Sequence, residues 1–233
     1  MGARRILVTG ASRGLGRAIT EHLLAKGDVV YGCSRGQSDL SHENYHHFSV
    51  DIGSDESIKT FFFELRRATR SLDALINNAG IASMNAFALT PPATYQQVFN
   101  INVQGTYLCS QKALGMLRKS DHGRIINFTT VAVPLQLEGE SIYAASKSAV
   151  ETLTKVIAKE YGNFGITCNA IGPSPIDTSL IKGVPASKIQ ELVQRQAIKK
   201  MATPGDVINV IDFYLQPGSD FITGQVLYLG GVS

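Results

Sequence analysis

The sequence contains no long apolar run and no basic cluster, and each absence excludes a class of protein. No apolar stretch reaches the ~20 residues that a membrane-spanning helix needs, and the N-terminus lacks the apolar segment of a signal peptide. Runs of Lys or Arg never exceed two residues, and the net charge is only +3. We therefore expect neither a nucleic acid nor a membrane as a partner.

Cysteine and histidine are also sparse. The three cysteines, Cys33, Cys109 and Cys168, are odd in number, widely spaced and flanked by apolar residues. This pattern predicts buried free thiols in a reducing, cytoplasmic compartment. The five histidines show no ligand spacing, and the neighbours His46 and His47 would point to opposite faces of a strand. We expect no metal site.

Short apolar, β-branched runs alternate with helical patterns along the whole chain, without a linker or an internal repeat. Strands are expected at residues 4–9, 28–33, 46–50, 72–77, 123–129, 165–170 and 225–229. Helices are expected near 14–26, 54–70, 94–119, 142–162, 186–200 and 204–215. This alternation predicts βαβ units and an α/β fold, a doubly wound parallel sheet covered on both faces. The chain length of 233 residues fits one globular domain.

A glycine-spaced turn follows the first expected strand. Gly10, Gly14 and Gly16 lie between an apolar strand and a helix, where glycines allow a sharp turn and a close approach to a pyrophosphate. The first N–H groups of the helix would face the phosphates. The motif favours dinucleotide binding, with a plain tight turn as the alternative.

One irregular stretch, residues 172–185, follows a predicted strand and leads into a short helix with an apolar face. Because ligands bind beyond the carboxyl ends of parallel strands, an insertion at 173–201, before the last helix and strand, is a candidate substrate lid. A surface excursion without function is the alternative.

Tyr143 and Lys147 lie four residues apart at the start of a predicted helix. They share a helix face, so the ammonium group can favour ionisation of the phenol, whereas burial opposes it. Moving a tyrosine pKa from about 10 towards neutrality requires ~4 kcal/mol. A chance pair is the alternative, but the position after the fifth predicted strand favours a catalytic role.

Two further groups of polar residues are ambiguous on their own. The run Asn77-Asn78-Ala79-Gly80 ends the fourth predicted strand and suits either a ligand-facing wall or a turn. Asn102 interrupts a long helical pattern, where asparagine competes for backbone hydrogen bonds, and a structural kink is as good an explanation as a function.

Together these residues resemble the short-chain dehydrogenase/reductase family. The glycine motif of residues 9–16, the Asn-Asn-Ala-Gly of 77–80, Asn102 and the Tyr-x-x-x-Lys of 143–147 stand in the family's order and spacing. The likeness covers almost the whole chain. It implies one Rossmann-type domain over residues 1–233 with about seven strands, hydride transfer between a nicotinamide and a carbonyl/alcohol pair, and a homotetramer or homodimer.

The resemblance also implies residue roles. Tyr143 is the general acid in reduction and the base in oxidation, Lys147 lowers the tyrosine pKa and binds the nicotinamide ribose, and Asn102 anchors a water of the proton relay. Asp51 bonds the adenine amine. The implied cofactor-binding set is Gly10, Ser12, Arg13, Gly14, Leu15, Gly16, Ser34, Arg35, Asp51, Ile52, Asn77, Ala79, Gly80, Tyr143, Lys147, Pro173, Ile176 and Thr178.

Two positions depart from the family pattern. Thr130 stands where the family usually has a serine; it keeps the hydroxyl that polarises the substrate carbonyl but adds a methyl group that restricts χ1. The adjacent Thr129 should point away. Ser174 replaces the glycine that usually follows the proline at 173, and we expect it to stiffen the loop beside the nicotinamide.

The end of the second predicted strand carries Ser34 and Arg35 instead of an acidic residue that would hold the ribose of NAD. Arg13 lies in the glycine turn, so two guanidinium groups are available to clamp a 2′-phosphate. This resembles members that prefer NADP(H). Two solvated arginines are the alternative.

The best overall match is to the 3-oxoacyl reductase type. Members that act on acyl carrier proteins tend to have arginines where this chain has Asp121 and Phe164, which disfavours an acidic carrier and leaves a CoA ester or a small ketone. The lid lysines suit either an anionic substrate or a solvated helix face; they are Lys182, Lys188, Lys199 and Lys200. An NADP-linked sugar, polyol or steroid dehydrogenase remains an alternative. So does a nucleotide-sensing protein without turnover.

Overall fold

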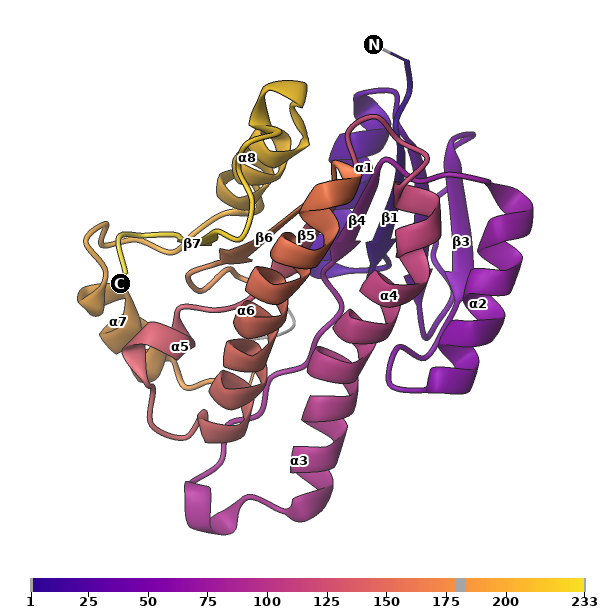
Figure 1. Ribbon diagram of the computed structural model, residues 1–233. Helices are drawn as coiled ribbons and strands as arrows, with labels where there is room; N and C mark the ends of the chain where they lie inside the picture. Colours follow the sequence, from indigo (N-terminus) through magenta and orange to yellow (C-terminus); the bar gives the residue numbers. More distant parts are fainter. Residues whose placement is uncertain (1, 179–182, 233) are drawn as a thin grey trace.

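The computed structural model describes residues 2–178 and 183–232 and contains a parallel sheet of seven strands. The strand order is β3-β2-β1-β4-β5-β6-β7, and the chain winds outwards from β1 in both directions (Figure 1). The bounds are β1 Arg5–Thr9, β2 Val29–Ser34, β3 Tyr45–Ser49, β4 Ala74–Asn77, β5 Arg124–Phe128, β6 Thr167–Gly172 and β7 Val226–Tyr228. The predicted doubly wound α/β fold is confirmed.

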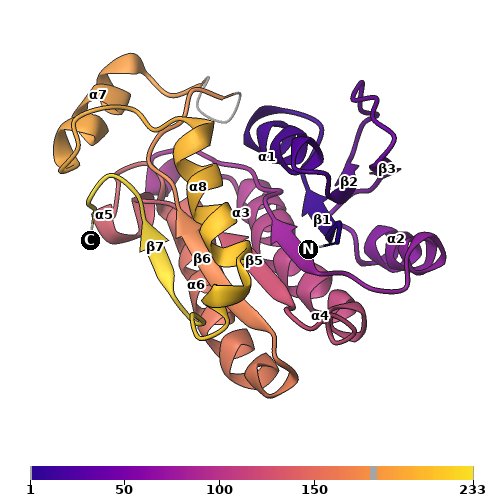
Figure 2. The same ribbon diagram turned by 90° about the horizontal axis from the view of Figure 1, so that it is seen from above.

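Helices cover both faces of the sheet. In chain order, the helices are α1 Gly14–Ala25, α2 Asp55–Ala68, α3 Pro92–Phe99, α4 Gly105–Leu117, α5 Ala132–Leu135, α6 Ser141–Tyr161, α7 Ala186–Arg195 and α8 Pro204–Leu215. Short 3-10 turns lie at Phe87–Leu89, Gly162–Phe164 and Pro217–Ser219. Seen from above, α1 and α8 lie on one side of the sheet, and α2, α4 and α6 lie on the other (Figure 2).

Successive side chains of a strand point to opposite faces of the sheet, so each face has its own apolar core. In β1, Leu7 packs into the core under α2, α4 and α6, whereas Ile6 and Val8 pack into the core under α1 and α8. All three side chains are fully buried. A strand with both faces buried reads as a continuous apolar run, which is why the sequence signal is clear here.

Local capping explains where two of the helices begin. The Ser54 hydroxyl accepts a hydrogen bond from the Ser57 N–H at the start of α2, and Thr203 forms a reciprocal capping box with Asp206 at the start of α8. Such caps satisfy N–H groups that have no partner within the helix. The cysteines at 33, 109 and 168 are buried and free, as predicted.

The expected single helix at 94–119 is instead α3, a π-helical turn over Asn100–Gln104, and α4. Hydroxyl groups bond back along this segment, from Thr106 to the Asn102 carbonyl and from Ser110 to the Thr106 carbonyl, both at 2.8 Å. Such back-bonding bends helices, and π turns are frequent at functional sites. The helical pattern is therefore irregular at Asn102, where the π turn lies between α3 and α4.

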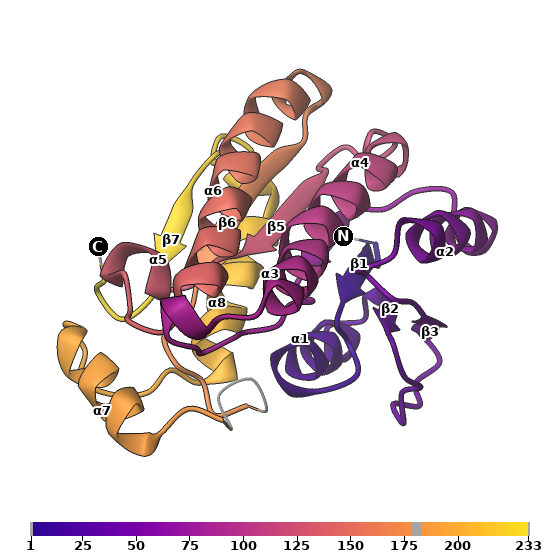
Figure 3. The ribbon, with the colours of Figure 1, turned by 90° about the horizontal axis from the view of Figure 1, so that it is seen from below.

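The expected helix at 186–200 ends earlier, at Arg195. The next residues turn to the C-terminal segment instead, and the N–H groups of Ala197 and Ile198 both donate to the Gly230 carbonyl. Figure 3 shows α7 outside the sheet and beside α5, where Arg195 donates to the Leu135 carbonyl at 3.0 Å. None of the helices in the described ranges is long and apolar enough to cross a bilayer.

Candidate active site

A cleft of about 820 Å³ opens at the carboxyl ends of β1, β2, β4, β5 and β6. This edge is where open parallel sheets bind ligands. The cleft gathers predicted residues from the whole chain: Gly10, Ser12, Arg13, Gly14, Leu15, Gly16, Ser34, Arg35, Asp51, Ile52, Ala79, Gly80, Thr130, Tyr143, Lys147, Pro173, Ile176 and Thr178. Two predicted residues, Asn77 and Asn102, do not line it.

The glycine turn forms one wall and leaves no room for side chains. A Cβ on Gly16 would lie 2.1 Å from the Gly10 carbonyl oxygen, and one on Gly10, where φ is +72°, would lie 2.9 Å from Nδ2 of Asn78. No side chain caps the start of α1, whose first turn holds no acidic residue. The N–H groups there are consequently available to a phosphate, and the turn fits a dinucleotide.

Asn78 and Ala79 hold this turn in place. Nδ2 of Asn78 donates to the carbonyls of Thr9 and Gly10 at 3.0 and 3.2 Å, and the Ala79 N–H donates to the Thr9 hydroxyl at 3.0 Å. The second asparagine of the motif therefore lies against the cleft.

The placement expected for Asn77 is wrong. Its side chain is buried beneath the cleft, where Nδ2 donates to Asn127 Oδ1 at 2.8 Å and to the Ser110 hydroxyl at 3.1 Å. The cause is strand alternation, because Asn77 ends β4 on the same face as Leu75, which belongs to the core under α4.

Arg13 and Arg35 line the cleft at the ends of β1 and β2 and are exposed. Neither makes an ion pair within residues 2–178 and 183–232. Arg17, by contrast, bonds Glu21 and Asp39. The backbone beside Arg35 is fixed, because its carbonyl accepts a hydrogen bond from the Ser49 hydroxyl at 3.1 Å. Two unpaired guanidinium groups on a fixed backbone fit an anionic group such as a 2′-phosphate.

Tyr143 and Lys147 project from the first turns of α6 and are both buried. Nζ of Lys147 donates to the Phe128 carbonyl at the end of β5, at 2.9 Å. Burial lowers the pKa of Lys147 to about 8 and raises the pKa of Tyr143 to about 12. The tyrosine is thus a neutral proton donor, and Lys147 is not among the groups that lower its pKa.

Thr130 lies beside Tyr143 at the end of β5. Its hydroxyl interacts with the phenol and offsets part of the rise in the tyrosine pKa, and it accepts a hydrogen bond from the Ala132 N–H at 3.2 Å. Thr129 points elsewhere, as expected, because its hydroxyl donates to Oε1 of Glu151 at 2.5 Å. The Tyr228 hydroxyl donates to the same carboxylate oxygen at 2.5 Å.

Asn102 is fully buried behind the cleft. Its amide pairs with the peptide groups of Ile81, accepting from the N–H and donating to the carbonyl, both at 2.9 Å, and it donates to the Ser146 hydroxyl at 3.0 Å. A Cβ on Gly80 would lie 3.3 Å from both Asn102 Oδ1 and Lys147 Nζ. The side chain therefore positions the cleft wall, and the expected water relay stays a prediction.

The predicted lid region passes over the glycine turn. Cβ of Thr178 lies 3.6 Å from the position that a Cβ on Gly14 would occupy. Ser174 is buried, and its hydroxyl ties the base of the segment to the Leu229 carbonyl at 2.9 Å, in line with the expected stiffening. Residues 179–182, and with them Lys182, lie outside the described residues.

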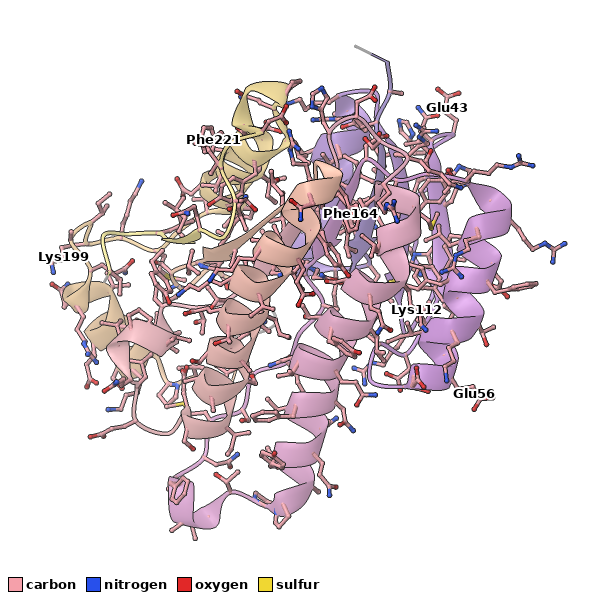
Figure 4. All side chains as sticks on the ribbon, viewed as in Figure 1. Glu43, Glu56, Lys112, Phe164, Lys199 and Phe221 are labelled. Carbon is pink, nitrogen blue, oxygen red and sulfur yellow. The ribbon has the colours of Figure 1, made fainter. Side chains whose placement is uncertain are left out.

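Two of the other lysines of this region are engaged elsewhere. Lys188 pairs with Glu191 at 3.0 Å, and Lys199 donates to the Gln194 carbonyl. Figure 4 shows Lys199 at the outer edge of the molecule, beside α7. These contacts favour a solvated helix face over a substrate site.

Glu140 also lines the cleft and was not predicted. It lies three residues before Tyr143 and its charge raises the pKa of that tyrosine. The only available signal was this spacing, which places both residues on one side of the start of α6.

No group of three His, Cys, Asp or Glu in the described ranges is arranged to hold a metal ion.

The known proteins that this sequence resembles are reductases and dehydrogenases. The family model described as enoyl-(acyl carrier protein) reductase matches residues 10–232. The chain is 29% identical to the 3-oxoacyl-[acyl-carrier-protein] reductase FabG of Vibrio harveyi, over 97% of this chain and 95% of that protein. It is 30% identical to the (2S)-[(R)-hydroxy(phenyl)methyl]succinyl-CoA dehydrogenase subunit BbsD of Thauera aromatica, over 98% and 95% of the two chains.

Solved structures share the whole fold. The ligand-free aldohexose dehydrogenase of Thermoplasma acidophilum superimposes with a TM-score of 0.89 at 28% identity, over 99% of this chain and 94% of that chain. A 4-hydroxyisoleucine dehydrogenase complexed with NADH gives 0.92 at 25% identity, over 99% and 98%. The chain belongs to the short-chain dehydrogenase/reductase family. It resembles 3-oxoacyl reductases and is an oxidoreductase of CH–OH groups with a nicotinamide cofactor.

Proposed function

We propose that the protein is an NADP(H)-dependent oxidoreductase that interconverts a ketone and a secondary alcohol, with the chemistry of a 3-oxoacyl reductase. The observation that carries this is the placement of Tyr143, Lys147 and Thr130 in the same cleft as the glycine turn. When bound, the nicotinamide supplies or accepts the hydride. Tyr143 donates the proton to the carbonyl oxygen in reduction, and Thr130 orients that oxygen with its hydroxyl.

In this mechanism Lys147 holds a positive charge near the tyrosine while bonded to the Phe128 carbonyl. A cation favours the phenolate that remains after proton transfer, and a positively charged oxidised nicotinamide would add to this effect. Asn102 acts indirectly, since it fixes the Ile81 backbone that lines the cleft.

The cofactor preference is part of the proposal. A related structure is complexed with NADH, but in this chain the end of β2 carries Ser34 and Arg35 instead of a carboxylate that would hold the ribose. The unpaired guanidinium groups of Arg13 and Arg35 in the cleft support a preference for the 2′-phosphate of NADP(H).

Turnover is tested by following NADPH oxidation, with NADH in parallel, against an acetoacetyl thioester, a β-keto ester, a cyclic diketone and a keto-sugar. Turnover of at least one ketone with NADPH supports the proposal. NADPH binding without turnover of any ketone, equal in wild type and Tyr143→Phe, would instead support a nucleotide-sensing protein. We propose a small ketone or CoA ester over an acyl carrier protein, because the exposed Asp121 stands where members that act on such carriers tend to have an arginine, and its charge would repel an acidic carrier.

A dehydrogenase of sugars or polyols is the second candidate. It is favoured by Glu140, whose carboxylate lines the cleft. The Thermoplasma relative is named for an aldohexose substrate.

We also propose a homotetramer or homodimer in a reducing, cytoplasmic compartment. The helices α3, α4 and α6 lie side by side at the front of the molecule (Figure 1). They expose Tyr95, Tyr107 and Val156 to 44–47%. Exposed aromatic side chains of this kind mark protein interfaces. Light scattering after size-exclusion chromatography tests the assembly, and a monomeric mass would contradict it.

A further inference from the structure

Glu140 is the acidic residue at the Tyr143 end of the cleft. Among the described residues that line the cleft, the other charged side chains lie at the cofactor end or, in the case of Lys147, are bonded to the backbone. The same lining contains apolar side chains from the α5 segment, the loop before α6 and the lid; they include Val131, Ala132, Leu137, Val184 and Leu192. A carboxylate in such surroundings selects the polar groups of a ligand.

The Glu140 carboxylate has no hydrogen-bond or ion-pair partner in the part of the chain that the structure describes. It stands at the N-cap of α6 but does not accept a hydrogen bond from the helix, so capping does not account for it. Partial burial raises its pKa. Among the described residues, its oxygens do not belong to the fully buried atoms without a partner, so water reaches them. A donor on a bound ligand can replace that water with a charge-assisted hydrogen bond.

The backbone around Glu140 is fixed before any ligand binds. Its N–H donates to the Leu137 carbonyl at 3.2 Å, and its own carbonyl accepts from the Ala144 N–H at 2.7 Å. The preceding Gly139 has φ +80°, and its carbonyl accepts from the Asn85 N–H at 2.8 Å. Groups held in this way lose little conformational entropy on binding and discriminate well between ligands.

We infer that Glu140 determines substrate class: it accepts a hydrogen bond from a hydroxyl or ammonium group that the ketone or alcohol carries near its reacting carbon, and it disfavours substrates with a carboxylate there. The inference rests on the proposed function. It deepens that function by selecting, among ketones and the alcohols formed from them, those that carry a hydroxyl or ammonium group over those that carry a carboxylate or no polar substituent.

The test uses secondary alcohols that differ in one substituent: methyl, hydroxymethyl, aminomethyl or carboxylate. For each, kcat/KM is measured with NADP⁺ for wild type, Glu140→Gln and Glu140→Leu. Glu138→Gln is the matched control, because Glu138 is exposed and does not line the cleft. We expect wild type and Glu138→Gln to favour a donor-bearing alcohol over the methyl compound by about tenfold or more, as one charge-assisted hydrogen bond allows.

The two variants separate the possible donors. Glu140→Gln keeps an acceptor oxygen without the charge, so it should retain the hydroxymethyl preference, lose an aminomethyl preference and gain on the carboxylate compound. Glu140→Leu should lose both preferences, so that its kcat/KM values for the methyl, hydroxymethyl and aminomethyl compounds become similar; Glu138→Gln is the control for basal activity. An unchanged substituent order in both variants would overturn the inference and leave the proposed oxidoreductase intact.

Calorimetric binding of the same alcohols to the NADP⁺-loaded protein distinguishes the two proposals if no turnover is seen. Selective binding of donor-bearing alcohols that Glu140→Leu abolishes would uphold the role of Glu140 and refute the oxidoreductase. Binding that is equally unselective in wild type and Glu140→Leu would refute the role of Glu140.

Discussion

Arg35→Asp should convert the cofactor preference from NADPH towards NADH. Arg35 lies in the cleft at the end of β2, exposed and without an ion pair in the described part of the chain. A charge-assisted hydrogen bond contributes about 1.5–3 kcal/mol, whereas exposed ion pairs contribute up to ~1 kcal/mol. Because Arg35 is exposed, we expect a value near ~1.4 kcal/mol, or about tenfold in affinity, for removing the guanidinium alone.

The aspartate adds two effects of the same sign. Its carboxylate repels a 2′-phosphate and can accept hydrogen bonds from the ribose hydroxyls of NADH. If together these contribute a further ~1.4 kcal/mol, the ratio of NADPH to NADH specificity falls about 100-fold in Arg35→Asp and about tenfold in Arg35→Ala.

The assay is kcat/KM for each cofactor at a saturating concentration of one ketone, at low and high salt. Arg17→Ala is the control, since Arg17 is already bonded to Glu21 and Asp39 and does not line the cleft. A ratio that stays the same in Arg35→Asp would refute the assignment of the phosphate clamp. Equal losses for NADPH and NADH would mean that Arg35 supports the loop and does not recognise the phosphate.

Three other predictions concern the end of the cleft that holds Tyr143, Thr130 and Lys147. Tyr143→Phe should lower kcat by ~10²–10⁴ while leaving NADPH affinity unchanged, and retained turnover would contradict its role as the acid. Thr130→Ser keeps the hydroxyl that meets Tyr143 and Ala132, so activity should persist or rise; a complete loss would show that the methyl is needed for packing. Lys147 binds fewer protons folded than unfolded between its pKa of about 8 and its usual 10.5, so stability should rise with pH in that window, by up to ~3 kcal/mol. Urea unfolding of wild type and Lys147→Met checks this: parallel pH profiles would contradict it.

Much of the fold was predictable because its signals are local. The run that forms β1 is apolar on both faces, and the glycines after it accept no side chain, as the contacts at Gly16 show. Helix starts such as Ser54 and Thr203 satisfy their own N–H groups within three residues. These features require only neighbours in the sequence, so periodicity and capping patterns reveal them.

The features that the sequence does not predict depend on contacts between residues that lie far apart in the chain. α7 ends at Arg195 because the following residues bond to Gly230, near the other end of the chain. The spacing of Glu140 from Tyr143 was its only signal, because its importance lies in its place in the cleft lining. No local pattern distinguishes a carboxylate facing solvent from one facing a cleft.

Asn102 joins both kinds of information. The sequence marks it as a helix interruption, and the structure has a π turn at this point. Its amide pairs with the Ile81 peptide, which requires the side chain to reach across to the loop after β4, and the helix widens to a π turn at this point. Its third hydrogen bond goes to Ser146, whose hydroxyl donates to the Tyr143 carbonyl at 2.7 Å. The irregular turn thus links the cleft wall to the helix that carries Tyr143 and Lys147, through three hydrogen bonds of one side chain.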